Sequence, residues 1–367
     1  ATFISTGKMH KQLSDMIQMI MRKVSEEYLV ELKIEFMSKI SAAITAVGGY
    51  VPDFILTNKI LESMVDTNDE WITSRTGIKE RRILKGPNKG TSFLAIQAAK
   101  DLIQKNNLDP TTIDLVIVAT ATPDMKAAST SAYTASEIGA TNAFAFDLDA
   151  ACSSFLFGMS VVARYIESGI YKKVLLIGAD KNSSMINYED RATCIIFGDG
   201  AGAALFEPNK EGFGVQDEYL KSDGSGREFL RATHGGSANA TTEESLKDHS
   251  QYVFQDGKTV FKYAVSGMAD VSEKIMQRNN LSHDDINWLV AHQANRRIID
   301  ATANRMALDD SKVLINIQKY GNTTSATLPL LLSDFENQLK KGDNIIFAAF
   351  GGGFTWGAIY LKWAYTK

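Results

Sequence analysis

The sequence contains only two cysteines, Cys152 and Cys194, among its 367 residues. Two cysteines cannot form a disulfide framework, so this usage fits a reducing compartment and predicts a cytoplasmic protein. No pair of histidines, and no histidine with a cysteine, stands at the spacing of metal ligands, which argues against a zinc site. No apolar run is long enough to cross a bilayer. The net charge of -4 gives no general attraction to nucleic acid or to anionic membranes.

Motifs that bind nucleotide phosphates are also missing. The pattern G-x-x-x-x-G-K-[ST] does not occur. The glycine clusters at 198–202 and 351–353 are followed by β-like sequence, whereas a dinucleotide fingerprint needs a helix directly after its glycines. Hydrophobic residues make up 44% of the chain, which is ordinary for a soluble globular enzyme. We therefore expect an enzyme with no metal and no tightly bound cofactor.

The first 36 residues differ from the rest of the chain. Met16, Ile17, Met19 and Ile20 suggest an amphipathic helix with mixed charges and no cleavage site of a secretory signal. We predict an N-terminal appendage over 1–36, to which we assign no chemistry.

The remainder repeats itself in outline. Residues 113–120 align with 286–293, and residues 174–179 align with 344–349. We predict two related α/β halves over 37–210 and 211–367. Helices alternate with strands in both, which favours a largely parallel sheet in each half, covered by helices.

Three local patterns carry further predictions. Thr67 and Glu70, three residues apart, resemble a capping box at the start of a helix. Residues 193–206 contain two strand-like pieces around the glycine cluster. Residues 221–249 are polar and rich in Gly, Ser and Thr, which predicts a long surface excursion.

Cys152 stands where a strand gives way to a helix. Residues 144–149 predict a short buried strand, and residues 153–168 predict a helix with apolar residues at helical spacing. Free backbone N–H groups and the positive end of the helix dipole point at such a junction. Both favour the thiolate, which is the nucleophilic form of cysteine. A small, buried and inert cysteine is the alternative.

His292 and Asn322 are the other candidate catalytic residues. His292 ends a very apolar strand, and α/β sheets bind ligands at the carboxyl ends of their strands. Asn322 lies in a turn of small residues that leads into a helix over 326–339. The alternatives are a hydrogen-bonded core histidine and an ordinary turn or N-cap asparagine. Cysteine, histidine and asparagine together are a familiar nucleophilic set.

The flanks of these residues resemble the family of β-ketoacyl-[acyl-carrier-protein] synthase III, in the thiolase superfamily. The matching motifs are Asp-Ala-Ala-Cys at 149–152, His-Gln-Ala-Asn at 292–295, Gly-Asn-Thr at 321–323 and Phe-Gly-Gly-Gly-Phe-Thr-Trp-Gly at 350–357. Residues 69–78 and 197–204 also fit, and the resemblance runs from about Met37 to the C-terminus. It implies a thiolase-like fold of two duplicated α/β halves, with mixed sheets packed in five layers (αβαβα), and a homodimer.

The resemblance implies a decarboxylative Claisen condensation that initiates fatty-acid synthesis. Cys152 would take the acyl group of an acyl-CoA primer, with the coenzyme A thioester as substrate. Malonyl-acyl carrier protein would then lose CO₂ and attack the acyl-Cys152 thioester, giving 3-ketoacyl-carrier protein. His292 and Asn322 would stabilise the enolate oxygen, and the backbone N–H groups of Cys152 and Gly352 would form a second oxyanion hole.

The same resemblance implies binding residues. Those for coenzyme A are Trp71, Arg75, Arg191, Phe261 and Asn295. Of these, Trp71 and Arg191 would lie on either side of the adenine. Those for the acidic carrier protein are Lys262, Arg297 and Arg305, a local positive surface that would steer association. For each, the alternative is a packing aromatic residue or a solvated charge.

The chain departs from the family's pattern at two places. Ala127 stands where a bulky residue usually reaches across the dimer into the partner's acyl pocket, and Ser-Ser follows Cys152 in place of Ala-Gly. The small Ala127 predicts that acyl groups longer or more branched than acetyl are accepted. Three other functions remain open: a related acyltransferase or condensing enzyme of secondary metabolism, a cysteine hydrolase, and a non-catalytic scaffold that binds acyl carriers.

Overall fold

The computed structural model describes residues 16, 18–19 and 40–367. The predicted appendage over 1–36 therefore falls, apart from three residues, outside the described part of the chain. Ser41–Lys367 form one compact unit. No helix in the described residues is long and apolar enough to cross a membrane.

The first sheet contains five strands in the order β1-β7-β6-β4-β5. Its strands are β1 (Ser41–Tyr50), β4 (Leu115–Ala119), β5 (Phe144–Leu148), β6 (Val174–Asp180) and β7 (Gly200–Asn209). β4 runs parallel to β5 and β6, whereas β7 runs antiparallel to both β6 and β1. β4 and β6 are buried along their whole length and consist mainly of Val, Ile, Leu and Ala, as strands covered on both faces require.

The second sheet repeats this arrangement. It contains β8 (Gly214–Ser222), β11 (Trp288–Ala291), β12 (Asn344–Gly351) and β13 (Thr355–Lys362) in the order β11-β12-β13-β8. Only β11 and β12 are parallel. The order matches β4-β6-β7-β1 of the first sheet, so the duplication predicted from the sequence is visible in the fold. The prediction of largely parallel sheets is wrong, because the three-residue connection between β12 and β13 permits only antiparallel pairing.

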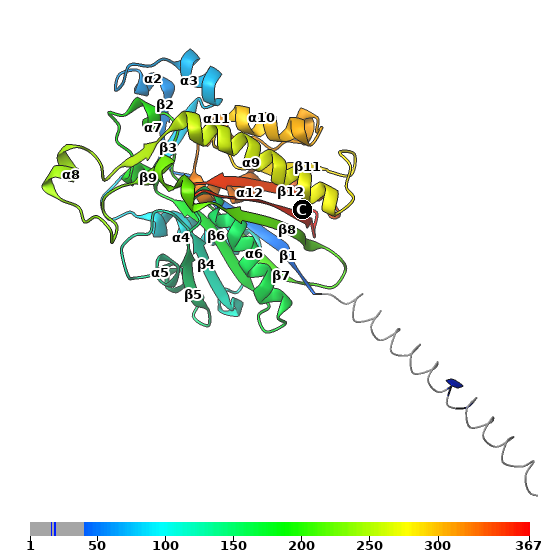
Figure 1. The fold of residues 1–367 in the computed structure, drawn as a ribbon. Coiled ribbons are helices and arrows are strands. Elements are labelled where there is room, and N and C mark those ends of the chain that lie inside the picture. Colours follow the sequence, from blue (N-terminus) through cyan, green and yellow to red (C-terminus); the bar gives the residue numbers. More distant parts are fainter. Residues whose placement is uncertain (1–15, 17, 20–39) are drawn as a thin grey trace, which may run out of the picture. The chain divides into compact units, whose positions relative to one another are not determined.

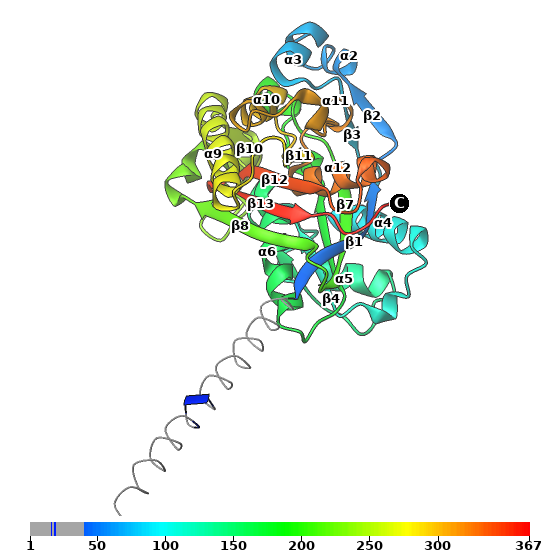
Figure 2. The ribbon, with the colours of Figure 1, turned by 90° about the vertical axis from the view of Figure 1, so that its right-hand side faces the viewer.

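Five layers result, as the resemblance implied. Helices α4 and α5 cover the outer face of the first sheet, α6 and α12 lie between the two sheets, and α9 and α10 cover the second sheet (Figures 1 and 2). The six helices are α4 (Thr91–Lys105), α5 (Thr130–Glu137), α6 (Ser154–Glu167), α9 (Gly257–Arg278), α10 (Arg296–Arg305) and α12 (Thr327–Phe335). The predicted boundary between the halves at residue 210 falls between β7 and β8 and stays a prediction.

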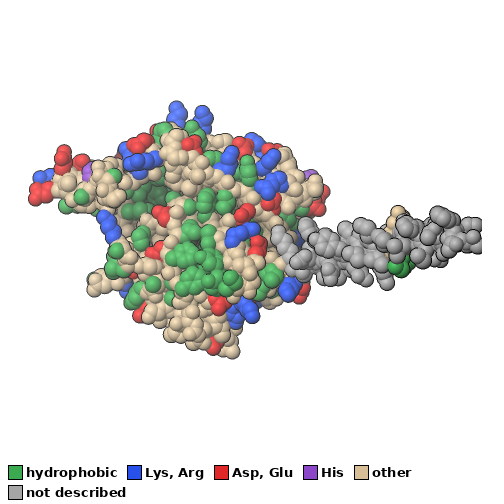
Figure 3. All heavy atoms as spheres, turned by 60° about the horizontal axis from the view of Figure 1, so that its bottom comes forward, with side chains coloured by type: hydrophobic (Ala, Val, Ile, Leu, Met, Phe, Trp, Pro, Cys, Tyr) green, Lys and Arg blue, Asp and Glu red, His purple; other side chains and the backbone are tan. Residues whose placement is uncertain are grey.

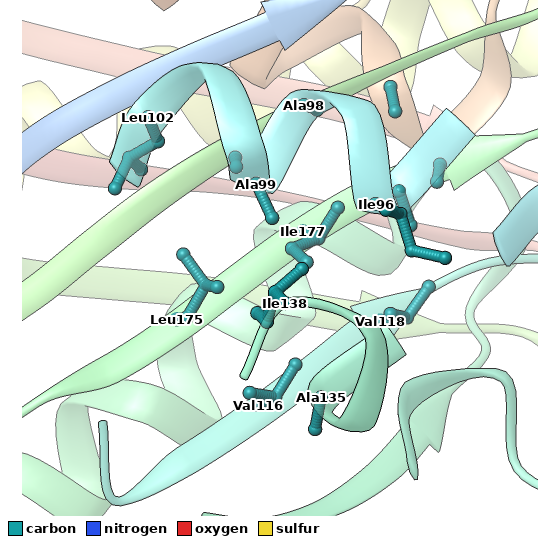
Figure 4. Packing of buried hydrophobic residues seen from close by; sticks show 14 of the residues in the cluster. Ile96, Ala98, Ala99, Leu102, Val116, Val118, Ala135, Ile138, Leu175 and Ile177 are labelled. Carbon is teal, nitrogen blue, oxygen red and sulfur yellow. The ribbon is translucent and has the colours of Figure 1, made fainter. Parts of the chain in front are cut away.

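Small side chains let the outer helices approach the first sheet closely. Figure 4 shows Ala98, Ala99 and Leu102 of α4 above the sheet, with Ile177 of β6 and Val118 of β4 below them. All five are fully buried. This dry contact fixes the sheet whose carboxyl-terminal edge leads to Cys152.

The remaining elements surround the edge of the sheets. They are β2 (Phe54–Thr57), α2 (Asn58–Leu61), α3 (Asp69–Thr76), β3 (Glu80–Ile83), α7 (Arg191–Cys194), β9 (Leu230–Ala232), α8 (Glu243–Lys247), β10 (Val253–Gln255) and α11 (Ile317–Tyr320). The helix start predicted at Thr67 is wrong by one residue, because the Oδ1 atom of Asn68 accepts from the Trp71 N–H at 2.8 Å. The prediction of two strand-like segments within 193–206 is wrong for the first of them. Asp190 caps the short helix α7 there, and only β7 follows.

Strand β5 differs from its prediction in burial. It forms the edge of the first sheet and pairs only with β4, so it is half-exposed, and Phe144 is 40% exposed. Phe144 and Phe146 pack with Tyr165 and Tyr171 into an aromatic cluster. Figure 3 turns the lower side of Figure 1 towards the viewer and shows hydrophobic side chains gathered on it. Apolar residues in a sequence do not distinguish burial within one chain from burial against another.

Candidate active site

Cys152 lies in a tight turn between β5 and the central helix α6. The turn Ala151–Ser153 is a single 3₁₀ turn, and Cys152 is 7% exposed. Within it, Ser154 Oγ accepts from the Ala150 N–H at 2.7 Å and donates to the Ala151 carbonyl at 2.6 Å. The predicted junction of strand and helix is confirmed, and Ser154 stabilises its backbone.

The glycine-rich end of β12 and the start of β13 pack directly against this turn. A Cβ atom at Gly351 would lie 2.8 Å from the Cys152 backbone nitrogen, so only glycine fits there. Ser153 Oγ donates to the Thr355 carbonyl at 3.0 Å, and Thr355 Oγ1 donates to the Ala150 carbonyl at 2.7 Å. Ser153 and Thr355 therefore hold the cysteine turn against the start of β13, whereas Ser154 stabilises the turn from within.

His292 follows β11 and is 1% exposed. Its Nδ1 atom lies 2.7 Å from Thr327 Oγ1, at the start of the second central helix α12. Its Nε2 atom has no hydrogen-bond partner among the described residues. Burial lowers the pKa of His292 to about 3, so the imidazole is neutral at physiological pH.

Asn322 lies in the turn that precedes α12 and is 5% exposed. Its backbone is held by β-type hydrogen bonds, from its N–H to the Ile196 carbonyl at 2.9 Å and from the Gly198 N–H to its carbonyl at 3.0 Å. Its side-chain Oδ1 accepts from the Thr324 N–H at 2.8 Å. With Oδ1 engaged in this way, the Nδ2 group is the one left for a ligand.

The three candidate residues meet in one cavity. A cavity of about 190 Å³ is lined by Cys152, His292 and Asn322, together with Phe261 and Asn295. A second cavity of about 460 Å³ begins at the same cysteine and is lined by Gly352 and Leu230. Cys152 therefore lies between two cavities. Leu230 borders both of them, although its segment was predicted to be a surface excursion.

The electrostatic prediction for Cys152 is wrong. Burial, reinforced by the nearby Asp180 carboxylate, raises the pKa of the thiol to about 12. Hydrogen bonds from Thr324 and Asn322 oppose this shift without cancelling it. Desolvation outweighs the helix terminus, so the resting side chain is a thiol and needs a base to become a nucleophile.

Asp180 is a buried residue of the site that the sequence analysis missed. It is fully buried at the end of β6 and accepts from the Ser325 N–H at 2.9 Å, the Ala121 N–H at 2.8 Å and the Thr122 hydroxyl at 3.0 Å. Burial raises its pKa to about 6. These bonds tie the first sheet to the turn that carries Asn322. No local sequence pattern predicts these hydrogen bonds, because Ser325 is 145 residues away from Asp180 in the sequence.

The comparison with known proteins decides the family. The protein named "Beta-ketoacyl-[acyl-carrier-protein] synthase III 2" from Bacteroides thetaiotaomicron is 56% identical over 329 residues, which are 90% of this chain and 98% of the relative. The chain belongs to the β-ketoacyl-[acyl-carrier-protein] synthase III family. Two family models agree: "3-Oxoacyl-[acyl-carrier-protein (ACP)] synthase III" at residues 146–224, and its C-terminal counterpart at residues 276–363. The prediction of a condensing acyltransferase of this family is confirmed.

Solved structures of a synthase III and of a priming ketosynthase share the fold of this synthase III chain. The 3-oxoacyl-[acyl-carrier-protein] synthase III of Aquifex aeolicus is 39% identical, with a TM-score of 0.81, and the match covers 88% of this chain and 100% of that one. The priming β-ketosynthase of the R1128 polyketide biosynthetic pathway is 30% identical, with a TM-score of 0.82, covering 89% and 97%. The thiolase-like fold predicted from the resemblance is therefore confirmed.

Three of the residues predicted to bind coenzyme A lie together, Trp71 and Arg75 in α3 and Arg191 in α7. Trp71 is half-buried, and the guanidinium carbons of Arg191 and Arg75 lie 5.0 Å and 5.3 Å from its ring centroid. Arg191 also donates to the Asp66 carbonyl at 3.0 Å. A purine between two flat groups needs about 7 Å between them, so the predicted position of the adenine would require Arg191 to move away from Trp71.

Asn295 has a structural bond besides its place in the cavity. It caps α10, and its Nδ2 group donates to the Arg75 carbonyl at 3.0 Å. The asparagine thus joins α3, which carries Trp71, to the wall of the cavity that holds Cys152.

The three predicted carrier-binding cations differ in their surroundings. Lys262 and Arg297 are exposed, and Arg297 lies over the ring of Phe261 at 4.6 Å. Arg305 instead contacts Asp270 at 2.8 Å and Glu273 at 3.3 Å, so its charge is already offset.

Ala127 does not line either cavity that contains Cys152. It is exposed and lies with Met125 and Phe146 on a third cavity of about 500 Å³, which shares Asp149 with the second one. Within residues 40–367, no three or more His, Cys, Asp or Glu side chains are grouped to hold a metal ion.

Proposed function

We propose that the protein condenses an acyl-CoA primer with malonyl-acyl carrier protein, releasing CO₂ and coenzyme A and forming 3-ketoacyl-carrier protein. One observation carries this proposal: Cys152, His292 and Asn322, from three distant parts of the chain, line one buried cavity. These residues provide a nucleophile and hydrogen-bond donors for a developing oxyanion. The first experiment is to supply malonyl-carrier protein with acetyl-, isobutyryl- or octanoyl-CoA and to weigh the carrier product. If none of the three primers gives a 3-ketoacyl group on the carrier protein, the proposal is contradicted.

The first half-reaction transfers the acyl group. The Cys152 thiol gives its proton to His292 Nε2 while its sulfur forms a bond to the thioester carbon. The carbon–sulfur bond to coenzyme A breaks, and the leaving thiolate takes the proton from His292. The N–H groups of Cys152 and Gly352 stabilise the tetrahedral oxyanion between these steps. The raised pKa of Cys152 is what makes a base necessary.

The second half-reaction forms the carbon–carbon bond. The malonyl carboxylate leaves as CO₂, and its bonding electrons move into an enolate whose oxygen accepts from His292 Nε2–H and Asn322 Nδ2–H. The enolate carbon attacks the acyl-Cys152 carbonyl, and the Cys152 thiolate leaves and is reprotonated from water. Each donor of such an oxyanion hole contributes about 10²–10³ in rate. Plain acyl transfer or hydrolysis needs no second hole, so Asn322 favours the condensing function.

A priming synthase of secondary metabolism with a longer acyl primer is the second candidate. Two observations favour it: the likeness to a polyketide priming ketosynthase and the small residue Ala127. The second cavity beside Cys152, of about 460 Å³, has room for more than an acetyl group. The choice of primer in the experiment above separates the two candidates, because strict preference for acetyl-CoA would exclude a longer primer.

The edge strand β5 supports a homodimer. An unpaired strand edge next to exposed aromatic residues is unfavourable in water and is covered when a second copy pairs with it. Phe144 at this edge is 40% exposed, and the aromatic cluster of Phe144, Phe146, Tyr165 and Tyr171 lies beside it. The substrates, coenzyme A thioesters and acyl carrier proteins, support a cytoplasmic location.

Removal of the Trp71 indole tests the adenine site. Stacking of a base on an aromatic ring is worth about 1–3 kcal/mol. We therefore expect Trp71→Ala to raise the KM for acyl-CoA by about 10-fold and to leave kcat nearly unchanged, whereas Trp71→Phe keeps most of the affinity. The KM for an acyl-pantetheine substrate, which has no adenine, is the control and should not change. An equal rise for both substrates would contradict adenine stacking.

Charge reversal on α9 tests the carrier surface. Lys262→Glu should raise the KM for malonyl-carrier protein by about 3- to 10-fold at low salt, and the effect should shrink as salt screens it. Arg305→Gln should have a smaller effect, because two carboxylates already offset that charge. Lys100→Glu, on the exposed face of α4 over the other sheet, is the matched control. Equal effects of Lys262→Glu and Lys100→Glu would place the carrier elsewhere.

A further inference from the structure

His292 Nδ1 has one hydrogen-bond partner among the described residues, the hydroxyl group of Thr327 at 2.7 Å. Thr327 is 1% exposed and begins the central helix α12. Its Oγ1 atom also lies 3.1 Å from the Thr324 carbonyl. A hydroxyl group has one proton to donate and two lone pairs to accept with, so Thr327 cannot donate to both neighbours at once.

The contacts of Thr327 allow two arrangements. In the first, Thr327 donates to the Thr324 carbonyl and accepts from His292 Nδ1–H, which leaves a free lone pair on Nε2. In the second, Thr327 donates to Nδ1, and Nε2 carries the proton. The Thr324 carbonyl also accepts from the Thr327 backbone N–H, so it keeps a donor in both arrangements. In both arrangements every buried polar group on the Nδ1 side of the ring has a hydrogen-bond partner.

The two half-reactions of the proposed function need opposite arrangements. Acyl transfer needs a lone pair on His292 Nε2 to take the Cys152 proton. Decarboxylation needs a proton on the same Nε2 to stabilise the enolate oxygen. Nε2 has no partner of its own in the described residues, and His292 lines the cavity with Cys152 and Asn322. It is therefore free to serve in either form.

We propose that Thr327 is a positioning residue that lets His292 exchange tautomers between the two half-reactions. This proposal rests on the proposed function. Rotation of the Thr327 hydroxyl proton, loss of the Nδ1 proton to water and gain of a proton from water at Nε2 convert the first arrangement into the second, and the reverse steps restore it. The exchange forms and breaks only N–H and O–H bonds and requires no oxidant or reductant. In the resting enzyme burial keeps the ring neutral, so one nitrogen is protonated at a time. During acyl transfer the ring carries both protons until Nε2 gives one to the leaving thiolate.

The tautomer is measured directly by NMR. In the full chain labelled with ¹⁵N-histidine, His292→Ala identifies the signals of His292 among those of the five histidines. We expect wild-type ¹⁵N shifts that are averaged between the two tautomers. Thr327→Val, nearly the same size but without the hydroxyl, should shift them to a single tautomer, and Thr327→Ser should restore the average. A wild-type spectrum of one tautomer that Thr327→Val does not change would overturn the proposal.

Rates of the separate half-reactions complete the test. In Thr327→Val, the half-reaction that needs the disfavoured tautomer should slow by about 10²-fold, while the other changes much less. A proton fixed on Nε2 should slow acylation of Cys152, and a proton fixed on Nδ1 should slow CO₂ release from malonyl-carrier protein. Equal slowing of both steps would indicate a merely structural role and overturn the proposal. If wild type catalyses neither step, the proposed function fails, whereas the NMR result still tests the exchange.

Discussion

Cys152→Ala should form no acyl-enzyme and should lower the rate of condensation by at least about 10⁴-fold, because no serine, threonine, lysine or second cysteine of the described residues lines the cavity. CO₂ release from malonyl-carrier protein should persist, since His292 and Asn322 remain in place. The two activities are measured as 3-ketoacyl product and as released CO₂. Separation of the two is expected only if the cysteine and the two polar side chains serve different steps.

Cys194→Ala is the matched control for this experiment. Cys194 is also buried, at the end of α7, and packs in a hydrophobic cluster with Leu61 and Ile72. It lines neither of the two cavities at Cys152. The variant should form the acyl-enzyme and condense within a few-fold of wild type. An acyl adduct on the Cys152→Ala variant, or loss of the adduct in the Cys194→Ala variant, would contradict the role of Cys152 as the nucleophile.

Asn322→Asp should slow condensation by about 10²–10³-fold while leaving acylation of Cys152 within a few-fold of wild type. The substitution keeps an Oδ1 acceptor for the Thr324 N–H at 2.8 Å, so the turn is preserved. It replaces the Nδ2 donor by an oxygen, which repels the developing enolate. Single-turnover acylation and steady-state condensation, measured on one preparation, provide the comparison.

The outcomes for this variant distinguish the remaining functions. Loss of acylation together with condensation would mean that Asn322 supports the nucleophile rather than the enolate. Unchanged condensation would remove Asn322 from the reaction and return the hydrolase and the simple acyltransferase to consideration. A large loss of thermal stability would reveal a structural role, and Asn322→Ala would show the same loss.

The duplicated fold explains how the site is assembled. Each half contributes one of the central helices α6 and α12, and Cys152 and Asn322, which precede these helices, line one cavity. Thr327, which contacts His292, is the first residue of α12. His292 comes from the end of β11, which corresponds to β4 in the first half. Residues 140 to 170 positions apart meet because the two halves pack with their central helices together.

Much of this arrangement was predictable from local patterns. The junction at Cys152 follows from an apolar strand and a helical period, and the place of His292 follows from the end of a strand in the repeat. The exposure of β5 was not predictable, because its apolar residues look the same whether they face the core or the sheet edge. The pKa of Cys152 was also predicted in the wrong direction. Helix termini can be read from sequence, but burial is a property of the whole fold.

The polar contacts around the site are the feature that the sequence predicts least. Asp180 and Thr327 sit in ordinary segments, and their functions depend on partners that only the folded chain brings close. Thr327 reaches His292 from 35 positions away. Hydrogen bonds of this kind have no period and no spacing, so the turn that contains Asn322 appears in the sequence only as a run of small residues.

The most direct measurement is the intact mass of the wild-type protein after incubation with acetyl-, isobutyryl- and octanoyl-CoA, followed by malonyl-carrier protein. We expect a single acyl adduct on Cys152 that is stable in buffer and is discharged by malonyl-carrier protein with release of CO₂. The acyl group that gives the adduct identifies the primer. An adduct that water removes at the same rate with or without malonyl-carrier protein, or no adduct from any of the three thioesters, would contradict the condensing function.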